Sequence, residues 1–197
     1  MDALPVRWWA DGRFVEPARE PAAPPSVRIV GVRGQPDRAT ARRTIRAALL
    51  DALAEAAGVP PASIRLGGAP GEAPYALLDD HRIPLSISHD GDLSVAALRL
   101  GGGAVGIDVM RVAGIPDWHA VAHDYLGPAC AAALARLPDA ARAAAFARAW
   151  SGREARLKCC GLALAEWQAG DDARLAAFSS WPLALPPGYV GTVALPG

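Results

Sequence analysis

The sequence predicts an α+β fold made of two similar halves, and the order of its segments carries this prediction. Helical segments rich in alanine, leucine and arginine occur at residues 37–57 and 128–164, and runs with the alternation of β-strands follow each of them. We expect a first half at 26–103 and a second half at 104–197, after an N-terminal segment with a proline-rich linker at 1–25.

In the first half, the packed fold is expected to begin near Ser26 with a strand at 27–32. A helix over residues 37–57 follows, and Gly58 is a typical helix stop. The sequence from there to Pro84 is rich in turn residues. We therefore expect one strand and one long helix before the next regular segment.

From Leu85 onward the pattern changes to short alternating runs. LSISH and LSVAALRL lie on either side of the turn Asp90-Gly91-Asp92, and three glycines at 101–103 precede AVGIDV. These runs predict an antiparallel meander. In the second half, helices are expected at 128–137 and from 139 to about 164, and PPGYVGTVAL predicts a closing strand.

Charge and composition exclude several classes of partner. Twenty basic and twenty acidic residues cancel, so no global field favours nucleic acid or an anionic membrane. No apolar run approaches transmembrane length, and the start MDALPVRWWADG lacks the pattern of a secretory signal, so a cytoplasmic location is expected. Three cysteines without C-x-x-C spacing predict reduced thiols.

The basic residues are unevenly chosen, because nineteen of the twenty are arginine and Lys158 is the single lysine. A compact ammonium in this setting suggests a role that a planar guanidinium fills less well, such as meeting a phosphate as a point charge.

Three short motifs carry candidate chemistry. Ser86-Ile87-Ser88-His89 ends a strand before a turn, where hydroxyls and an imidazole could face an anion, but a structural histidine is the commoner outcome for such a motif alone. In Val105-Gly106-Ile107-Asp108-Val109-Met110, strand alternation puts Ile107 and Val109 on one side and Asp108 and Met110 on the other. Asp108 is then either a paired structural acid or a metal ligand.

The third motif, Trp150-Ser-Gly-Arg153-Glu154-Ala-Arg-Leu-Lys158, falls in a helix. Trp150, Glu154 and Lys158 are four residues apart and share one stripe, so Glu154 and Lys158 are neighbours. A solvated ion pair is the ordinary interpretation. Against it, Glu154 is the only acid between Ala140 and Cys160, among several basic residues.

In this order the motifs resemble the Sfp-like 4′-phosphopantetheinyl transferases, which show a Ser-His pair, then G-I-D-x-E, then W-x-x-K-E-A-x-x-K. The resemblance implies two pseudo-symmetric α+β halves with an active cleft between them. It implies transfer of the 4′-phosphopantetheine of coenzyme A to a serine of an apo acyl or peptidyl carrier protein, with Mg²⁺ as cofactor. It also implies a holo-carrier-protein synthase that acts as a monomer, since one chain contains both halves.

Carried over to this sequence, the resemblance gives each motif a role. Ser88 and His89 would contact the 3′-phosphate of coenzyme A, and Asp108 and Glu154 would hold Mg²⁺. Lys158 would neutralise the pyrophosphate, and Glu154 would be the base that takes the serine proton.

This chain departs from the family pattern in four places. Met110 stands where the family usually has the glutamate of its metal pair, and a thioether is a poor ligand for a hard cation. Glu72, in Gly71-Glu72-Ala73-Pro74, stands where a base often meets a phosphate, and Arg153 replaces a lysine. The segment HDYLGPACAAAL lacks a glutamate that many relatives carry. An impaired homologue that binds coenzyme A or a carrier protein without transfer is therefore the alternative function.

Overall fold

The structure is a computed structural model that describes residues 2–15, 27–68 and 72–197. Of the N-terminal part expected at 1–25, the segment at residues 2–15 is described, and the proline-rich linker that follows it lies outside the described residues. The helices and strands are β1 (Arg7–Ala10), β2 (Arg13–Val15), β3 (Val27–Arg33), α1 (Arg38–Ala57), a 3₁₀ turn (Pro61–Ser63), β4 (Arg65–Gly67), β5 (Tyr75–Leu78), β6 (His81–Asp90), β7 (Leu93–Arg99), β8 (Gly106–Arg111), α2 (Trp118–Leu126), α3 (Pro128–Ala135), α4 (Asp139–Cys159), α5 (Asp171–Leu175), β9 (Phe178–Pro182) and β10 (Tyr189–Pro196).

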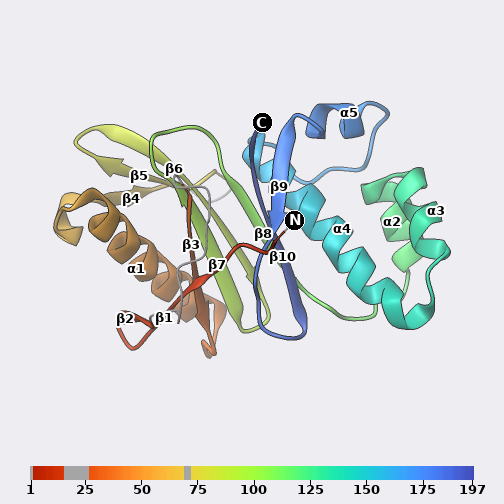
Figure 1. Ribbon diagram of the computed structural model, residues 1–197, viewed down its shortest axis with the longest axis horizontal. Coiled ribbons are helices and arrows are strands. Elements are labelled where there is room, and N and C mark those ends of the chain that lie inside the picture. Colours follow the sequence, from red (N-terminus) through yellow and green to blue (C-terminus); the bar gives the residue numbers. More distant parts are fainter. Residues whose placement is uncertain (1, 16–26, 69–71) are drawn as a thin grey trace.

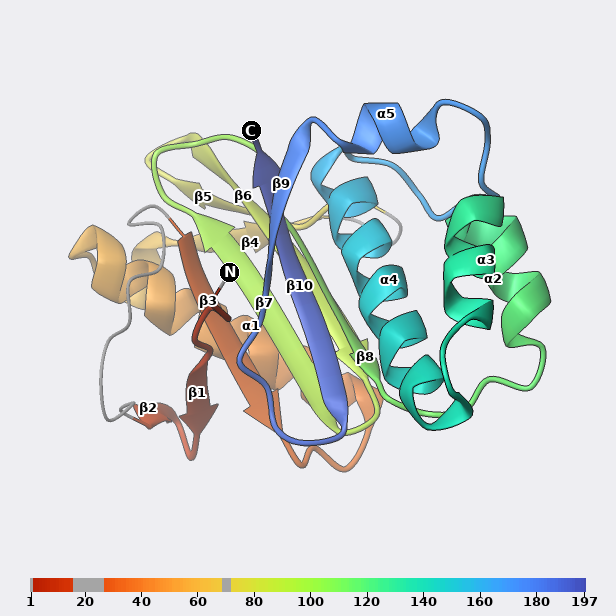
Figure 2. The ribbon, with the colours of Figure 1, turned by 45° about the vertical axis from the view of Figure 1, so that its right-hand side comes forward.

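The strands form a mixed α+β architecture of two sheets with helices outside them (Figure 1). The larger sheet has the order β2-β1-β3-β7-β6-β5-β4, and the smaller has the order β8-β10-β9. Helix α1 covers the outer face of the larger sheet, and α4 covers the outer face of the smaller one. Helices α2 and α3 lie beyond α4, as the turned view in Figure 2 also shows.

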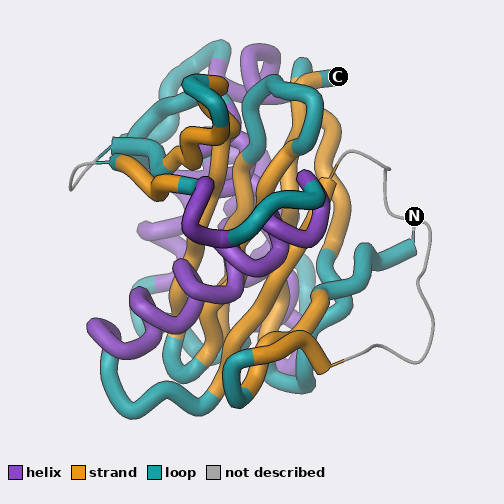
Figure 3. Tube along the Cα trace, turned by 90° about the vertical axis from the view of Figure 1, so that its left-hand side faces the viewer, coloured by secondary structure: helices purple, strands orange, loops and turns teal. Residues whose placement is uncertain are grey.

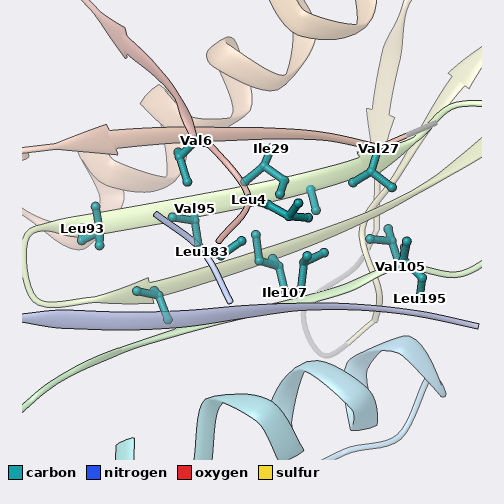
Figure 4. Close-up of a cluster of buried hydrophobic side chains, with 13 residues drawn as sticks. Leu4, Val6, Val27, Ile29, Leu93, Val95, Val105, Ile107, Leu183 and Leu195 are labelled. Atoms are coloured by element: carbon teal, nitrogen blue, oxygen red, sulfur yellow. The ribbon is translucent and has the colours of Figure 1, made fainter. Parts of the chain in front are cut away.

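The alternation of β3 and β7 explains why the sheets stack. Val30 and Val32 of β3 contact the core under α1, whereas Val27 and Ile29 contact the core between the sheets. Figure 4 shows this inter-sheet core, to which both sheets contribute branched aliphatic side chains. Figure 3, viewed from the α1 side, shows the strands running behind that helix.

Helix α1 is confirmed almost to the residue, for local reasons. Asp37 caps its start by accepting a hydrogen bond from the Thr40 backbone amide at 2.8 Å. Gly58 ends it with a φ of 67°, a left-handed conformation that glycine adopts without strain. The strand expected at 27–32 and the closing strand in PPGYVGTVAL are also present, as β3 and β10.

The expectation that the packed fold begins near Ser26 is wrong. Leu4 and Val6 are buried in the inter-sheet core, and Leu4 exchanges backbone hydrogen bonds with Pro182 and Ala184. Strand β1 pairs in parallel with β3. The N-terminal segment therefore bridges the two sheets. This contact joins residues far apart in the sequence, and no local sequence pattern predicts it. The division at residue 103 and the pseudo-symmetry of the halves remain predictions.

The predicted meander is only partly correct. Strands β6 and β7 pair as expected, but β8 leaves them and pairs antiparallel with β10. The segment before Pro84, expected to be rich in turns, contains β4 and β5; β5 pairs with the first residues of β6, and β4 pairs with β5. In the second half, α2 precedes the two expected helices, and the expected helix to about 164 ends at Cys159.

Candidate functional site

We call the close contact of β8 with α4 at Gly106 the β8–α4 joint, and this contact positions the residues of the site. A Cβ atom on Gly106 would overlap the carbonyl oxygen of Ala155 and would lie 2.6 Å from the backbone nitrogen of Cys159. Only glycine therefore lets the two backbones come this close. The contact brings the next residues of β8 directly under one stripe of the helix.

That stripe is the one expected from the sequence. Trp150, Glu154 and Lys158 occur at successive four-residue spacings on α4 and line the same hollow as Asp108. The hollow has a volume of about 420 Å³. It is lined by Arg38, Ile87, Ser88, His89, Asp90, Asp108, Val109, Met110, Trp150, Glu154 and Lys158. All five sequence-predicted site residues thus meet in one place, together with residues from both sides of position 103.

Lys158 joins the two carboxylates. Its Nζ donates to Asp108 Oδ1 at 2.7 Å and lies 3.6 Å from Glu154 Oε2. The same ammonium lies 3.3 Å from the carbonyl oxygen of Ile107, to which it also donates. A compact ammonium with three donors suits this convergence of three acceptors, whereas a planar guanidinium presents a fixed fork.

Both carboxylates are shielded from water. The side chain of Asp108 is 8% exposed and that of Glu154 is 18% exposed. Burial raises the pKa of Asp108, although Lys158 and Ser88 oppose this shift. Burial also raises the pKa of Glu154, and the nearby charge of Asp108 adds to that rise, while Lys158 opposes it. A carboxylate with a raised pKa is a better proton acceptor once ionised.

Ser88 and His89 point to opposite faces of β6, as strand alternation requires. The Ser88 hydroxyl donates to Asp108 Oδ1 at 2.8 Å and accepts from the Val109 amide at 3.2 Å. His89 Nδ1 lies 2.6 Å from the hydroxyl oxygen of Ser94, on the face that α1 covers. The two residues of the Ser-His motif therefore have different surroundings.

His89 is half-buried, and burial lowers its pKa to about 4, with the charges of Arg38, Arg42 and Lys158 acting in the same direction. The imidazole is therefore neutral near pH 7. It lies where a second hollow, of about 310 Å³, reaches the first turn of α1, and Arg38 and Asp90 line both hollows.

Met110 lines the main hollow on the same side of β8 as Asp108, as predicted. It also packs against the apolar cluster of α2, α3 and α4, which includes Phe146 and Trp118. The thioether thus has a packing role at the edge of the site.

Most basic residues of α4 do not surround Glu154. Arg153 is 7% exposed and donates to Asp171 at 2.6 Å, a bond that ties α5 to α4. Its Nε atom has no hydrogen-bond partner among the described residues. Arg156 donates to the Phe178 carbonyl and the Ser180 hydroxyl, and Arg142 caps the end of α3 at Leu137. Among the α4 cations with a charged or polar contact, Lys158 is the one that reaches Glu154.

The described residues contain no group of three or more histidine, cysteine, aspartate or glutamate side chains that could hold a metal ion. Asp108 and Glu154 supply hard oxygen donors, which suit Mg²⁺ when phosphate oxygens and water complete the shell. The donor set fits such a shared site, and the Met110 sulfur does not add to it.

The sequence did not indicate Arg38 or the side chain of Asp90 as part of the site, and it indicated Ser86 as a member of an anion-facing motif and not as a partner of β8. Ser86 and Asp90 share the Ser88 face of β6, and they accept hydrogen bonds from the amides of Ile107 and Arg111 on β8. The spacing Ser86, Ser88, Asp90 was the available signal, since every second residue of a strand lies on one face. Of the GEAP segment, Gly71 lies outside the described residues, and the Pro74 carbonyl accepts from the Leu85 amide.

Two further hollows lack this combination of groups. A cavity of about 350 Å³ between α3, α4 and α5 is lined by Arg153, Arg156 and Asp172, whose cations bond mainly within the protein. A larger hollow of about 910 Å³ is lined by Trp8, Trp9 and the prolines at 186–187. Among these hollows, the one lined by Asp108, Glu154 and Lys158 is where two carboxylates meet one ammonium.

A family model described as the 4′-phosphopantetheinyl transferase superfamily matches residues 104–185. These 82 of 197 residues run from just before β8 to just beyond β9, so they include Asp108, Glu154 and Lys158 and leave out β6. The match supports phosphopantetheine transfer as the general reaction class. The curated proteins contain no match to the chain. No helix in the described ranges is long and apolar enough to cross a bilayer.

Proposed function

We propose that this protein transfers the 4′-phosphopantetheine arm of coenzyme A to a serine of an apo carrier protein. The observation that carries the proposal is the meeting of Lys158 with Asp108 and Glu154 in one hollow, within the segment that matches the transferase superfamily. Two carboxylates beside a cation, one carboxylate from β8 and the other groups from α4, suit the transfer of a phosphate-linked group.

Asp108 and Glu154 would hold Mg²⁺ together with the pyrophosphate of coenzyme A. The bound ion would neutralise charge that develops on the pyrophosphate oxygens during transfer. The Lys158 ammonium contacts both carboxylates, so it would lie beside the pyrophosphate as a second source of positive charge. Arg38 lines the same hollow from α1 and adds positive charge to its wall.

In the transfer step, the hydroxyl oxygen of the carrier serine forms a bond to the phosphorus atom that carries the pantetheine arm. The bond from that phosphorus to the bridging oxygen breaks, and adenosine 3′,5′-bisphosphate leaves with the electron pair. Glu154 takes the serine proton directly or through water. Its raised pKa supports this role, because the ionised group is a stronger base than an exposed glutamate.

The roles predicted for the Ser-His motif differ in their support. His89 lines both hollows and is neutral near pH 7, so it offers a hydrogen bond and not a charge to the 3′-phosphate. Ser88 already uses its hydroxyl proton for Asp108, so a direct phosphate contact by that hydroxyl would require the bond to be exchanged. We propose His89 as the main phosphate contact of this pair.

The carrier protein is proposed to be an acyl or peptidyl carrier of fatty acid, polyketide or nonribosomal peptide synthesis. One chain supplies both walls of the hollow, which supports a monomer as the active unit. We propose the cytoplasm as its place of action. Purified protein, coenzyme A and Mg²⁺ should add one phosphopantetheine mass to one serine of a suitable apo carrier, as measured by intact-protein and peptide mass spectrometry.

The alternative is a homologue that binds coenzyme A or a carrier without transfer, and Met110 and Glu72 are the observations that favour it. It predicts coenzyme A affinity that calorimetry finds unaffected by Mg²⁺, beside an inactive assay. The proposed transferase predicts coenzyme A affinity that rises with Mg²⁺ concentration, because the ligand completes the metal site.

A further inference from the structure

Strand β8 is held at its outer edge by side chains and not by a main-chain ladder. It is an edge strand of the smaller sheet, where its partner is β10. Its other edge faces residues 86–90 of β6, whose backbone pairs with β7, and the contacts that β8 makes there are with side chains of β6. An unpaired row of strand amides next to a buried core requires acceptors.

Three side chains of β6 provide these acceptors at a spacing of two residues. The Ile107 amide donates to Ser86 Oγ at 3.0 Å, the Val109 amide donates to Ser88 Oγ at 3.2 Å, and the Arg111 amide donates to Asp90 Oδ2 at 2.6 Å. The period matches on both strands, since alternate amides of β8 face β6. We call Ser86, Ser88 and Asp90 the side-chain ladder.

Ser88 differs from Ser86 in one respect. Its hydroxyl accepts from Val109 and also donates its single proton to Asp108 Oδ1, the atom that Lys158 contacts. Ser88 and Ser86 are 6% and 4% exposed, so neither exchanges its bond easily with water. One residue therefore sets both the position of β8 and the orientation of the Asp108 carboxylate.

We propose that Ser88 is a positioning residue that orients the Asp108 carboxylate toward Lys158 and the metal site through its own hydrogen bond to Asp108 Oδ1, a bond that Ser86 does not make. The geometric part of this proposal stands on the contacts above, and its consequence for Mg²⁺ rests on the proposed function. Partners that bond to a ligating carboxylate orient it, and their loss typically weakens metal binding by about tenfold or more.

The test compares Ser88→Ala with Ser86→Ala, a matched control that removes a ladder bond of the same kind without touching Asp108. Because Lys158 is the only lysine, protein labelled with ¹⁵N-lysine gives one side-chain ammonium signal. We expect Ser88→Ala to shift or broaden this signal and Ser86→Ala to leave it in place. Amide hydrogen exchange should accelerate about tenfold or more at Val109 in the first variant and at Ile107 in the second.

A magnesium titration of coenzyme A binding gives the functional readout. Ser88→Ala should raise the half-maximal Mg²⁺ concentration about tenfold, and Ser86→Ala should leave it within about twofold, inside the scatter expected of a site that does not touch the metal ligands. The proposal is overturned if both variants change the Lys158 signal equally, or if neither does. A wild-type protein without Mg²⁺-dependent coenzyme A binding would count against the proposed function, while the Lys158 signal would still decide the role of Ser88.

Discussion

Lys158 shows at the scale of one residue why side-chain shape matters in this site. Its ammonium meets Asp108, the Ile107 carbonyl and Glu154 in a space bounded by two backbones. The unusual choice of lysine in an arginine-rich chain indicated a special role, and its spacing from Glu154 indicated the neighbour. Contact with Asp108 depends on the packing of α4 on β8, which the sequence does not display.

Replacing Lys158 by arginine tests the need for a compact ammonium. Lys158→Arg keeps the charge but presents a larger planar group, so we expect transfer to fall by about tenfold or more, equivalent to roughly 1.4 kcal/mol in the barrier. Arg148→Lys, a change at an exposed position of the same helix, should leave the rate unchanged. Equal rates for wild type and Lys158→Arg would show that shape is unimportant there.

Met110 offers a gain-of-function test at the same scale. Met110→Glu adds a carboxylate beside Asp108, and we expect it to lower the half-maximal Mg²⁺ concentration for coenzyme A binding about tenfold. Met110→Gln matches the shape without the charge and should not do so. A neutral or harmful effect of the glutamate would mean that Met110 does not lie beside the metal.

At the scale of elements, the β8–α4 joint decides whether the site exists. Gly106→Ala would force apart the backbones at Ala155 and Cys159, so we expect a loss of stability of about 1–3 kcal/mol and loss of transfer. At Gly114, no atom of the described residues lies within 4 Å of an added Cβ, so Gly114→Ala should change stability by less than about 0.5 kcal/mol. Chemical unfolding measures both, and equal stability of the two variants would contradict the close contact.

Elements with local signals were predictable and elements without them were not. Helix α1 has its cap at Asp37 and its stop at Gly58 within its own sequence. Strands β4 and β5 are three and four residues long, and they are strands because β5 pairs with β6 and β4 pairs with β5. The partner of β8 is β10, almost eighty residues later, so the sheet to which β8 belongs could not be inferred from turns nearby.

At the scale of the whole molecule, His89 couples stability to pH. Its pKa is about 4 in the folded protein and 6.5 in an unfolded chain. Between pH 6.5 and pH 4, therefore, the imidazole is protonated in the unfolded chain and neutral in the folded protein. This contribution to the unfolding free energy therefore falls as pH is lowered from 6.5 to 4 and is constant below pH 4.

His89→Gln should remove that component, so its melting temperature should fall less than that of wild type between pH 6.5 and 4.5, by about 2–4 °C for each kcal/mol involved. His123→Gln, at an exposed histidine, should follow the wild-type curve. Parallel curves for wild type and His89→Gln would contradict the burial of a neutral imidazole.

The site as a whole was largely predictable as a set of residues and only partly as a geometry. Spacing within α4 and alternation within β8 indicated Glu154, Lys158 and Asp108, because both periods are local. The bond of Ser88 to Asp108 and the contribution of Arg38 depend on contacts between elements that are not adjacent in sequence, whereas His89 meets Ser94 within the β6–β7 hairpin. The bridging of the two sheets by Leu4 belongs to the same class.

The most direct test of the proposed transferase compares wild type with Glu154→Gln in the carrier assay. We expect one added phosphopantetheine per apo carrier with wild type and none above background with the variant. We also expect an equal or higher melting temperature for the variant at pH 8, since a raised pKa means that ionised Glu154 costs stability above that pKa. Absence of product with wild type across several carriers at raised Mg²⁺, or equal product with Glu154→Gln, would contradict the proposed function.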